Sequence, residues 1–186
     1  MADIPTLRQQ LDDIDNSLLA LLVERLAVAD EIGELKGGRV FDPAREFALT
    51  EARVAAFAAL PAPVVRQFVR DWVSLCRGHQ GQFAIASSAP QLVPLLLGRY
   101  TQVLESSEPL AAVFAGQAQG ALLPSPWPSD LGGLFPAACC EYEGHSFLLL
   151  TADGCNDGDL TLRLHQQRWQ IEPGQQFSRW PLLWNH

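Results

Sequence analysis

The chain has 186 residues, of which 48% are hydrophobic, and it carries a formal net charge of −8. This length allows one large domain or two small ones, and the composition excludes an intrinsically disordered chain. The negative charge disfavours nucleic acid and acidic membranes as partners, so an anionic ligand would need a local cluster of cations. No apolar run is long enough to span a bilayer, and the acidic start MADIPTLRQQLDDIDN does not resemble a signal peptide. We therefore expect a cytoplasmic protein.

Residues 5–80 have the apolar periodicity of helices. The first predicted helix carries one apolar stripe from Leu7 to Ile32 and runs to about Lys36, where two glycines end it. A helix of this length measures about 48 Å at 1.5 Å per residue. A domain that ends near residue 80 cannot cover such a helix alone, which predicts pairing with a second copy of the chain.

Two shorter helices are expected to follow. Asp42 is the predicted N-cap of the second helix, with Pro43 at its first position. The turn from Leu60 to Pro63 separates it from a third helix, which runs to about Gln80.

Two cations lie on one side of the first predicted helix. Arg25 sits on the apolar stripe, and Lys36, eleven residues later, points within about 20° of the same direction. A charge that faces a core is costly unless it is paired, so this side meets either acidic residues across an interface or an anionic ligand. Lys36 is also the only lysine of the chain, which indicates either a need for a compact donor or a chance occurrence.

From residue 83 onward, short apolar runs alternate with turns rich in proline and glycine, which predicts a small α/β domain. The predicted strands contain residues 83–86, 121–123, 147–150 and 160–164, and the predicted helices cover 91–97 and 109–115. The cysteines form no CxxC pair, so we expect reduced thiols and no zinc site. They are Cys76, Cys139, Cys140 and Cys155.

Three segments carry a family resemblance: LRQQLDDIDNSLLALLVERLAVADEIGELK, DPARE and WVSLCRGHQ. In this order they resemble the all-helical chorismate mutases over residues 5–80. The resemblance implies a three-helix domain at 1–81 with a long first helix, an intertwined homodimer, and a small α/β domain at 82–186. It also implies the rearrangement of chorismate to prephenate in aromatic amino-acid biosynthesis, without a cofactor or metal.

The resemblance assigns four residues to the substrate carboxylates and their surroundings. Arg8 would reach into the neighbouring subunit's site and bind one carboxylate. Arg25 would hold a carboxylate within its own subunit. Asp42 would position or neutralise nearby cations, and Arg45 would support the carboxylate-binding group.

Four more residues are assigned to the reacting part of the substrate. Lys36 and Gln80 would donate to the ether oxygen of the breaking C–O bond, and Glu46 would accept from the ring hydroxyl. Cys76 would stand where the family often has a small polar residue. Because the ether oxygen gains negative charge as its bond breaks, fixed donors stabilise the transition state more than the ground state.

Two features depart from the family pattern. Only five residues separate Lys36 from Asp42, so the loop over the substrate is shorter than usual. A one-residue shift of the third helix would put Leu75 and His79 at the two site positions of that helix. Isochorismate pyruvate-lyases and aminodeoxychorismate mutases share the scaffold, and a non-catalytic regulatory or effector-binding protein is a further alternative.

The second half resembles prephenate dehydratases through VFAGQAQGALLP and HSFLLL. His145 and Ser146 stand where the resemblance leads one to expect Thr-Arg. Only twenty residues separate Pro124 from His145, which is too few for the second lobe of such an enzyme. We therefore expect a degenerate, one-lobed, non-catalytic domain, with an unrelated small α/β domain as the alternative.

Overall fold

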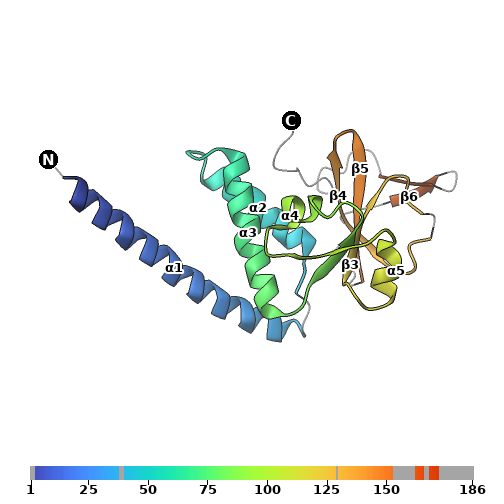
Figure 1. Ribbon diagram of the computed structural model, residues 1–186, viewed down its shortest axis with the longest axis horizontal. Coiled ribbons are helices and arrows are strands. Elements are labelled where there is room, and N and C mark those ends of the chain that lie inside the picture. The colour runs from blue at the N-terminus through green and yellow to red at the C-terminus, as the bar shows by residue number, and fades with distance from the viewer. Residues whose placement is uncertain (1–2, 38–39, 129, 153–161, 166–167, 172–186) are drawn as a thin grey trace.

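The computed structural model describes residues 3–37, 40–128, 130–152, 162–165 and 168–171. Its first part consists of three helices, α1 (Ile4–Leu35), α2 (Pro43–Ala56) and α3 (Ala62–Gln80). The three predicted helices are therefore confirmed, with ends close to those expected. Figure 1 shows that α1 projects away from the rest of the molecule, whereas α2 and α3 pack against each other.

Local signals in the sequence set the ends of these helices. The carboxylate of Asp3 accepts a hydrogen bond from the Thr6 N–H at 3.0 Å, and that of Asp42 accepts one from the Arg45 N–H at 3.0 Å. Each carboxylate satisfies a backbone donor that the first turn leaves free, as predicted for Asp42. Gly37 follows α1 with φ of 66°, a left-handed conformation that favours glycine, so the chain turns there.

The second part of the chain is an α/β unit, which confirms the predicted class. Its elements in chain order are β1 (Ala84–Ser87), α4 (Leu92–Leu97), β2 (Gln102–Glu105), α5 (Pro109–Phe114), β3 (Gly120–Pro124), β4 (Phe135–Tyr142), β5 (His145–Thr151), β6 (Leu162–His165) and β7 (Arg168–Ile171). Five strands form one mixed sheet in the order β2-β1-β3-β5-β4. In it β1 is parallel to β2 and β3, and β5 is antiparallel to β3 and β4. β6 and β7 pair separately.

The sequence does not predict strands β2, β4 and β7, and composition explains why β2 and β4 are missed. β2 lies at the edge of the sheet, and most of its residues are exposed, so it contains no apolar run. β4 begins Phe-Pro-Ala-Ala, and proline and alanine are poor strand formers. Cys155 and the C-terminal residues 172–186 lie outside the described residues.

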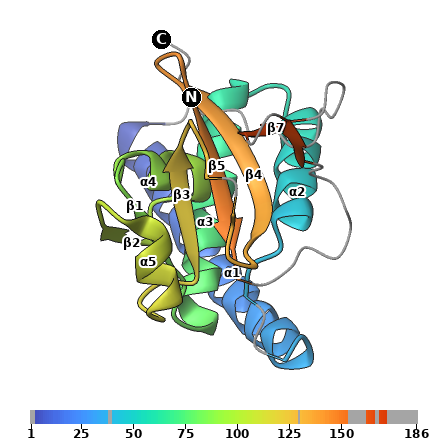
Figure 2. The same cartoon turned by 90° about the vertical axis from the view of Figure 1, so that its right-hand side faces the viewer.

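Two clusters of buried side chains cover the two faces of the five-stranded sheet. Figure 2 shows three of its strands, β3, β5 and β4, side by side. One cluster joins residues of β1, β3, β4 and β5 to α4 and to Phe41, which precedes α2. The other packs α5 and Trp127 against the opposite face. Phe41 is 5% exposed, and its ring centroid lies 4.9 Å from that of Phe83. The helical part and the sheet therefore share one core. None of the helices in the described residues is long and apolar enough to cross a membrane.

The shared core predicts that the two parts unfold together. Leu96 of α4 is fully buried in the cluster that contains Phe41, so Leu96→Ala should lower the free energy of unfolding by about 2–5 kcal/mol. Denaturant titrations followed by far-UV circular dichroism and tryptophan fluorescence should show one coincident transition. Val103→Ala, in the partly exposed edge strand β2, is the control and should cost less than about 1 kcal/mol. Two separate transitions would contradict a shared core.

Candidate functional site

One cavity of about 210 Å³ lies where the C-terminal half of α1 meets α2 and α3. It brings together seven of the eight predicted site residues from three helices and from the loop before α2. The seven are Arg25, Lys36, Asp42, Arg45, Glu46, Cys76 and Gln80.

Arg8 is the predicted residue that this cavity does not include. It is exposed in the N-terminal half of α1, seventeen residues before Arg25. That separation corresponds to about 25 Å along the helix axis, farther than an arginine side chain extends. Within one chain, Arg8 therefore lies away from the other seven residues.

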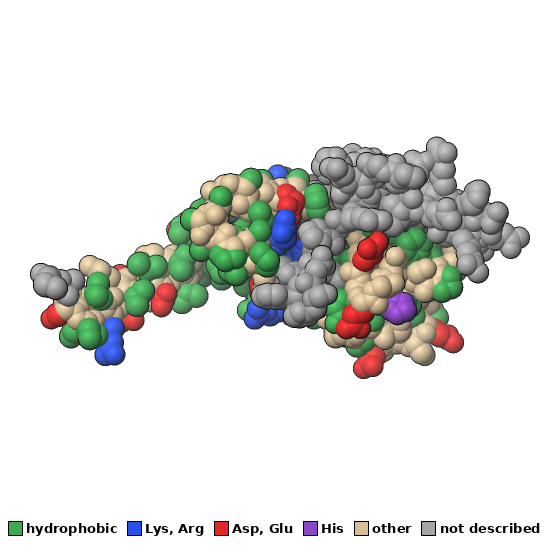
Figure 3. All heavy atoms as spheres, turned by 90° about the horizontal axis from the view of Figure 1, so that it is seen from above, with side chains coloured by type: hydrophobic (Ala, Val, Ile, Leu, Met, Phe, Trp, Pro, Cys, Tyr) green, Lys and Arg blue, Asp and Glu red, His purple; other side chains and the backbone are tan. Residues whose placement is uncertain are grey.

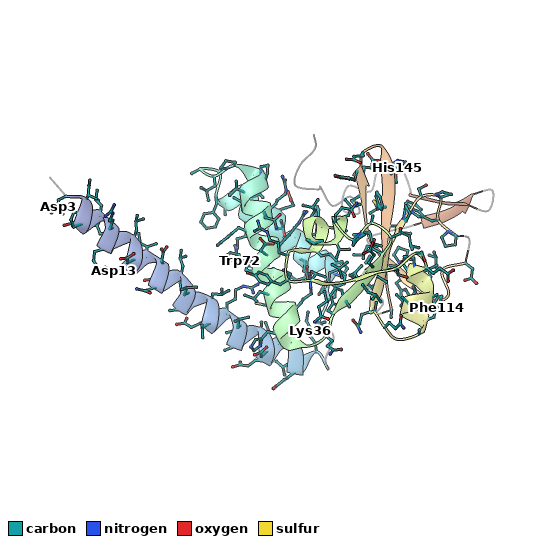
Figure 4. The ribbon with its side chains drawn as sticks, viewed as in Figure 1. Asp3, Asp13, Lys36, Trp72, Phe114 and His145 are labelled. Carbon is teal, nitrogen blue, oxygen red and sulfur yellow. The ribbon has the colours of Figure 1, made fainter. Side chains whose placement is uncertain are left out.

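The guanidinium group of Arg25 faces α3, as its place on the apolar stripe indicates. Its Nη1 donates to the Cys76 Sγ, and its Cζ lies 5.5 Å from the ring centroid of Trp72. Figure 4 shows Trp72 on the side of α3 that faces α1. Among the described residues, Arg25 has no carboxylate partner. Its guanidinium group contacts a thiol and an aromatic ring instead. An arginine in these surroundings is available to an anionic ligand.

Lys36 lies at the end of α1 and points to Asp42 across the short connection between α1 and α2. The Lys36 Nζ is 3.4 Å from the Asp42 Oδ2, and the two side chains are 42% and 44% exposed. An ion pair this exposed contributes about 0–1 kcal/mol to stability. The lysine can therefore exchange this carboxylate for a ligand atom at little cost.

Glu46 forms a buried ion pair that the sequence reading did not anticipate. Its Oε2 accepts a hydrogen bond from the Nη1 of Arg77, whose side chain is only 3% exposed. The sequence did contain a signal: Val65, Val69, Val73 and Arg77 follow each other at four-residue spacing, and all four are buried. Arg77 is therefore a cation on the apolar face of its helix, which is the same pattern that singles out Arg25 in α1.

Burial controls the protonation of two cavity residues. It raises the pKa of the Glu46 carboxyl above its ordinary value, although the charge and hydrogen bond of Arg77 act in the opposite direction. Burial also raises the pKa of the Cys76 thiol, against the opposing effect of the Arg25 charge. At neutral pH, Cys76 is therefore a neutral thiol.

Gln80 faces the cavity from the last turn of α3, and its Nε2 donates to the backbone carbonyl of Ala29. Gly33 makes this approach possible, because a Cβ there would lie 3.3 Å from the Gln80 Cδ. His79 points elsewhere, with its Nδ1 3.0 Å from a carboxylate oxygen of Asp30. Among the described residues, no group of His, Cys, Asp or Glu is placed to hold a metal ion.

The link between Arg25 and Cys76 can be tested through thiol reactivity. Because burial raises the pKa of Cys76, its alkylation by iodoacetamide should reach half of its maximal rate at a pH above that of an exposed cysteine. Arg25→Ala should move this midpoint further up, since the Arg25 charge favours the thiolate. Peptide mass spectrometry separates Cys76 from the buried Cys139 and Cys140. An unchanged or lower midpoint in Arg25→Ala would contradict the contact.

The helical part of the chain is similar to known proteins. Residues 7–81 match the model of the family described as chorismate mutase type II. The T-protein of Enterobacter agglomerans is 34% identical over 80 residues, which are 38% of this chain and 21% of that protein. A bifunctional chorismate mutase/prephenate dehydratase of Neisseria gonorrhoeae is 37% identical over 97 residues, 51% of this chain and 25% of that protein.

The chain thus spans only about a fifth to a quarter of the length of these two relatives. No solved structure matches it significantly. Every residue that lines the cavity, from Arg25 to Gln80, falls inside the segment that the family model matches. The helical part of the chain, residues 7–81, is therefore similar to the chorismate mutase type II family.

Proposed function

We propose that this protein is a chorismate mutase, which rearranges chorismate to prephenate in aromatic amino-acid biosynthesis. The observation that carries the proposal is the convergence of cations, donors and a carboxylate on one cavity within a domain of this family. Chorismate is a dianion that must fold into a chair-like geometry before it rearranges. Arg25 and Lys36 supply positive charge at two points of the cavity, which can hold the substrate carboxylates in that geometry.

The polar side chains of the cavity fit the charge that develops during the reaction. Lys36 and Gln80 are the candidate donors to the ether oxygen, where negative charge grows as the C–O bond breaks. In this structure they contact the exposed Asp42 and the Ala29 carbonyl, respectively. Among the described residues, the Oε1 of Glu46 has no partner, so it can accept from the ring hydroxyl while Oε2 stays bound to Arg77.

Removal of one proposed donor should slow the reaction strongly. Lys36→Ala is expected to lower kcat by about 10²–10³-fold, the usual loss for a donor that stabilises developing negative charge. Arg53→Ala, exposed in the last turn of α2, is the control and should retain wild-type turnover. The assay follows the consumption of chorismate at fixed pH.

Wild-type turnover of chorismate with unchanged turnover in Lys36→Ala would place the reaction outside this cavity. Parallel assays with isochorismate and aminodeoxychorismate separate the proposed reaction from others on the same scaffold. We also propose that the α/β unit is not a dehydratase. Enzymatic formation of phenylpyruvate from prephenate would overturn that part of the proposal.

We further propose that two copies of the chain pair through α1. Every residue from 3 to 21 is exposed, and Figure 3 shows hydrophobic side chains along the projecting helix. The exposed apolar residues at stripe positions of this half are Leu7, Leu11, Ile14, Leu18 and Leu21. An isolated helix with such a face is marginal in water, so a second helix is needed to cover it.

The cavity also favours a second copy. At about 210 Å³ it is smaller than the typical 300–1,000 Å³ of small-molecule sites, as expected of a site that lacks one wall. Arg8 is too far from the cavity of its own chain to contribute to it. In the proposed homodimer, Arg8 enters the cavity of the other copy and supplies the remaining cation for the substrate.

A complementation experiment tests whether Arg8 acts between chains. Arg8→Ala and Arg25→Ala should each be nearly inactive. Refolded together in equal amounts, they should recover about one quarter of wild-type activity, because half of the molecules are mixed dimers with one intact site each. No recovery in a preparation shown by mass spectrometry to contain mixed dimers would mean that both arginines serve the same chain's site. A monomer in sedimentation at assay concentration would contradict the pairing itself.

A further inference from the structure

Arg77 is a buried cation that contacts both the mutase cavity and the α/β unit. Its Nη1 donates to Glu46 of α2, inside the cavity. Its Nη2 donates to the backbone carbonyl of Leu97 at 2.6 Å and to the Thr101 Oγ1 at 2.9 Å, both beyond the mutase domain. The two halves of one planar guanidinium group are thus held by different parts of the chain.

The α/β side of this contact is rigidly built. Leu97 is the last residue of α4, so its carbonyl is one of those that the helix itself leaves free. The Thr101 hydroxyl donates to the same carbonyl at 3.1 Å while it accepts from Arg77. Gly98 follows with φ of 93°, and a Cβ there would lie 2.2 Å from the backbone oxygen of Arg70 in α3. Only glycine lets the end of α4 come this close to α3.

Aromatic rings complete the surroundings of the guanidinium group. The Arg77 Cζ lies 5.1 Å from the ring centroid of Phe41 and 5.2 Å from that of Phe83. Phe41 immediately precedes Asp42, the N-cap of α2, and Phe83 immediately precedes β1. Because the guanidinium group is planar and rigid, fixing its Nη2 also fixes the direction in which Nη1 donates to Glu46.

We infer that Arg77 is a positioning residue through which the α/β unit orients the Glu46 carboxylate in the mutase cavity. The catalytic role of Glu46 in this inference rests on the proposed function. The contacts that join Leu97 and Thr101 to Glu46 through Arg77 do not depend on it. The α/β unit then acts as a support of the active site, since Leu97 and Thr101 aim Arg77 at Glu46. Glu46 in turn keeps its Oε1 toward the substrate hydroxyl.

Several other charges also affect the pKa of Glu46, so the test must distinguish the effect of Arg77 from theirs. Arg25 of α1 lowers its pKa, Asp42 before α2 raises it, and Arg70 of α3 also interacts with it. Arg77 makes the largest charge contribution that opposes the effect of burial. Ionised Glu46 is a stronger hydrogen-bond acceptor than the protonated acid, so activity is expected to fall as the pH drops through its pKa. Loss of the Arg77 charge raises that pKa and should move this acidic limb to higher pH.

The experiment measures the pKa of Glu46 in the full-length protein by NMR of ¹³C-labelled glutamate carboxyls, assigned with Glu46→Gln. Arg77→Met should raise this pKa further, because the charge and the hydrogen bond that oppose the effect of burial are lost. Thr101→Val leaves the charge in place and removes one anchor, so it should produce a smaller rise and lower kcat more than it changes KM. Arg77→Lys should restore part of the effect of Arg77→Met.

Arg66→Met is the matched control, because Arg66 makes a similar α3–α2 ion pair with Glu51, at 2.8 Å for both of its hydrogen bonds, outside the cavity. It should leave the pKa of Glu46 and the pH profile of kcat/KM unchanged. If Arg77→Met does not fold, Arg77→Lys and Thr101→Val carry the test.

The outcomes distinguish the inference from the proposed function. A Glu46 pKa and a pH profile that are the same in wild type, Thr101→Val and both Arg77 variants would overturn the inference, even in an active enzyme. A response of the Glu46 pKa to the Arg77 and Thr101 changes in a protein without chorismate turnover would support the structural link and reject the proposed function.

Discussion

The buried guanidinium group of Arg77 is the constraint on which the arrangement of the site depends. A charge that is 3% exposed is tolerated only when nearby groups compensate it, and here a carboxylate, a carbonyl and a hydroxyl accept hydrogen bonds from Nη1 and Nη2. These partners come from α2, from the end of α4 and from the loop after α4. One cation thus requires three separate segments to keep fixed relative positions. The same requirement explains why the helical part and the sheet share a core instead of meeting across a wet surface.

The positive charge of this acidic protein is concentrated locally, as the proposed binding of a dianion requires. The net charge is −8, yet the cavity is lined by four cations, Arg25, Lys36, Arg45 and Arg77. Two carboxylates, Asp42 and Glu46, offset part of this charge through ion pairs with Lys36 and Arg77. The exposed pair of Lys36 and Asp42 can open for a ligand, whereas the buried pair of Arg77 and Glu46 stays closed. The cavity therefore combines one exposed ion pair that can open with one buried ion pair that stays fixed.

The sequence was sufficient to predict much of this arrangement, because helical periodicity is a strong signal. The apolar residues from Leu7 to Ile32 repeat at helical spacing, and the Asp42-Pro43 pair marks the start of α2. These two signals predict which residues share a face of α1 and of α2. The register of α3 was left open by one residue. The structure places Cys76 and Gln80 at the cavity because the buried face of this helix includes Val69 and Val73.

Long-range contacts could not be predicted in the same way. The partners of Arg77 at Leu97 and Thr101 lie twenty and twenty-four residues away, and no local pattern indicates that α4 returns to α3. Strand β2 escaped detection because an exposed edge strand has no apolar run to mark it. The contacts of Arg77 with Leu97 and Thr101 depend on tertiary packing, so only the structure reveals them. The buried stripe of α3 indicated that Arg77 was unusual, but not what it would bind.

The projecting half of α1 has a consequence for how this protein behaves on dilution. Residues 3 to 21 are all exposed, so within one chain that half is held by hydrogen bonds inside the helix itself. Short isolated helices fray, and a helix that is ordered by its partner loses order when the partner dissociates. For the proposed pair, helix content and specific activity would decline together as the protein concentration falls below the dissociation constant. The concentration of the chain would then itself regulate how many complete sites exist.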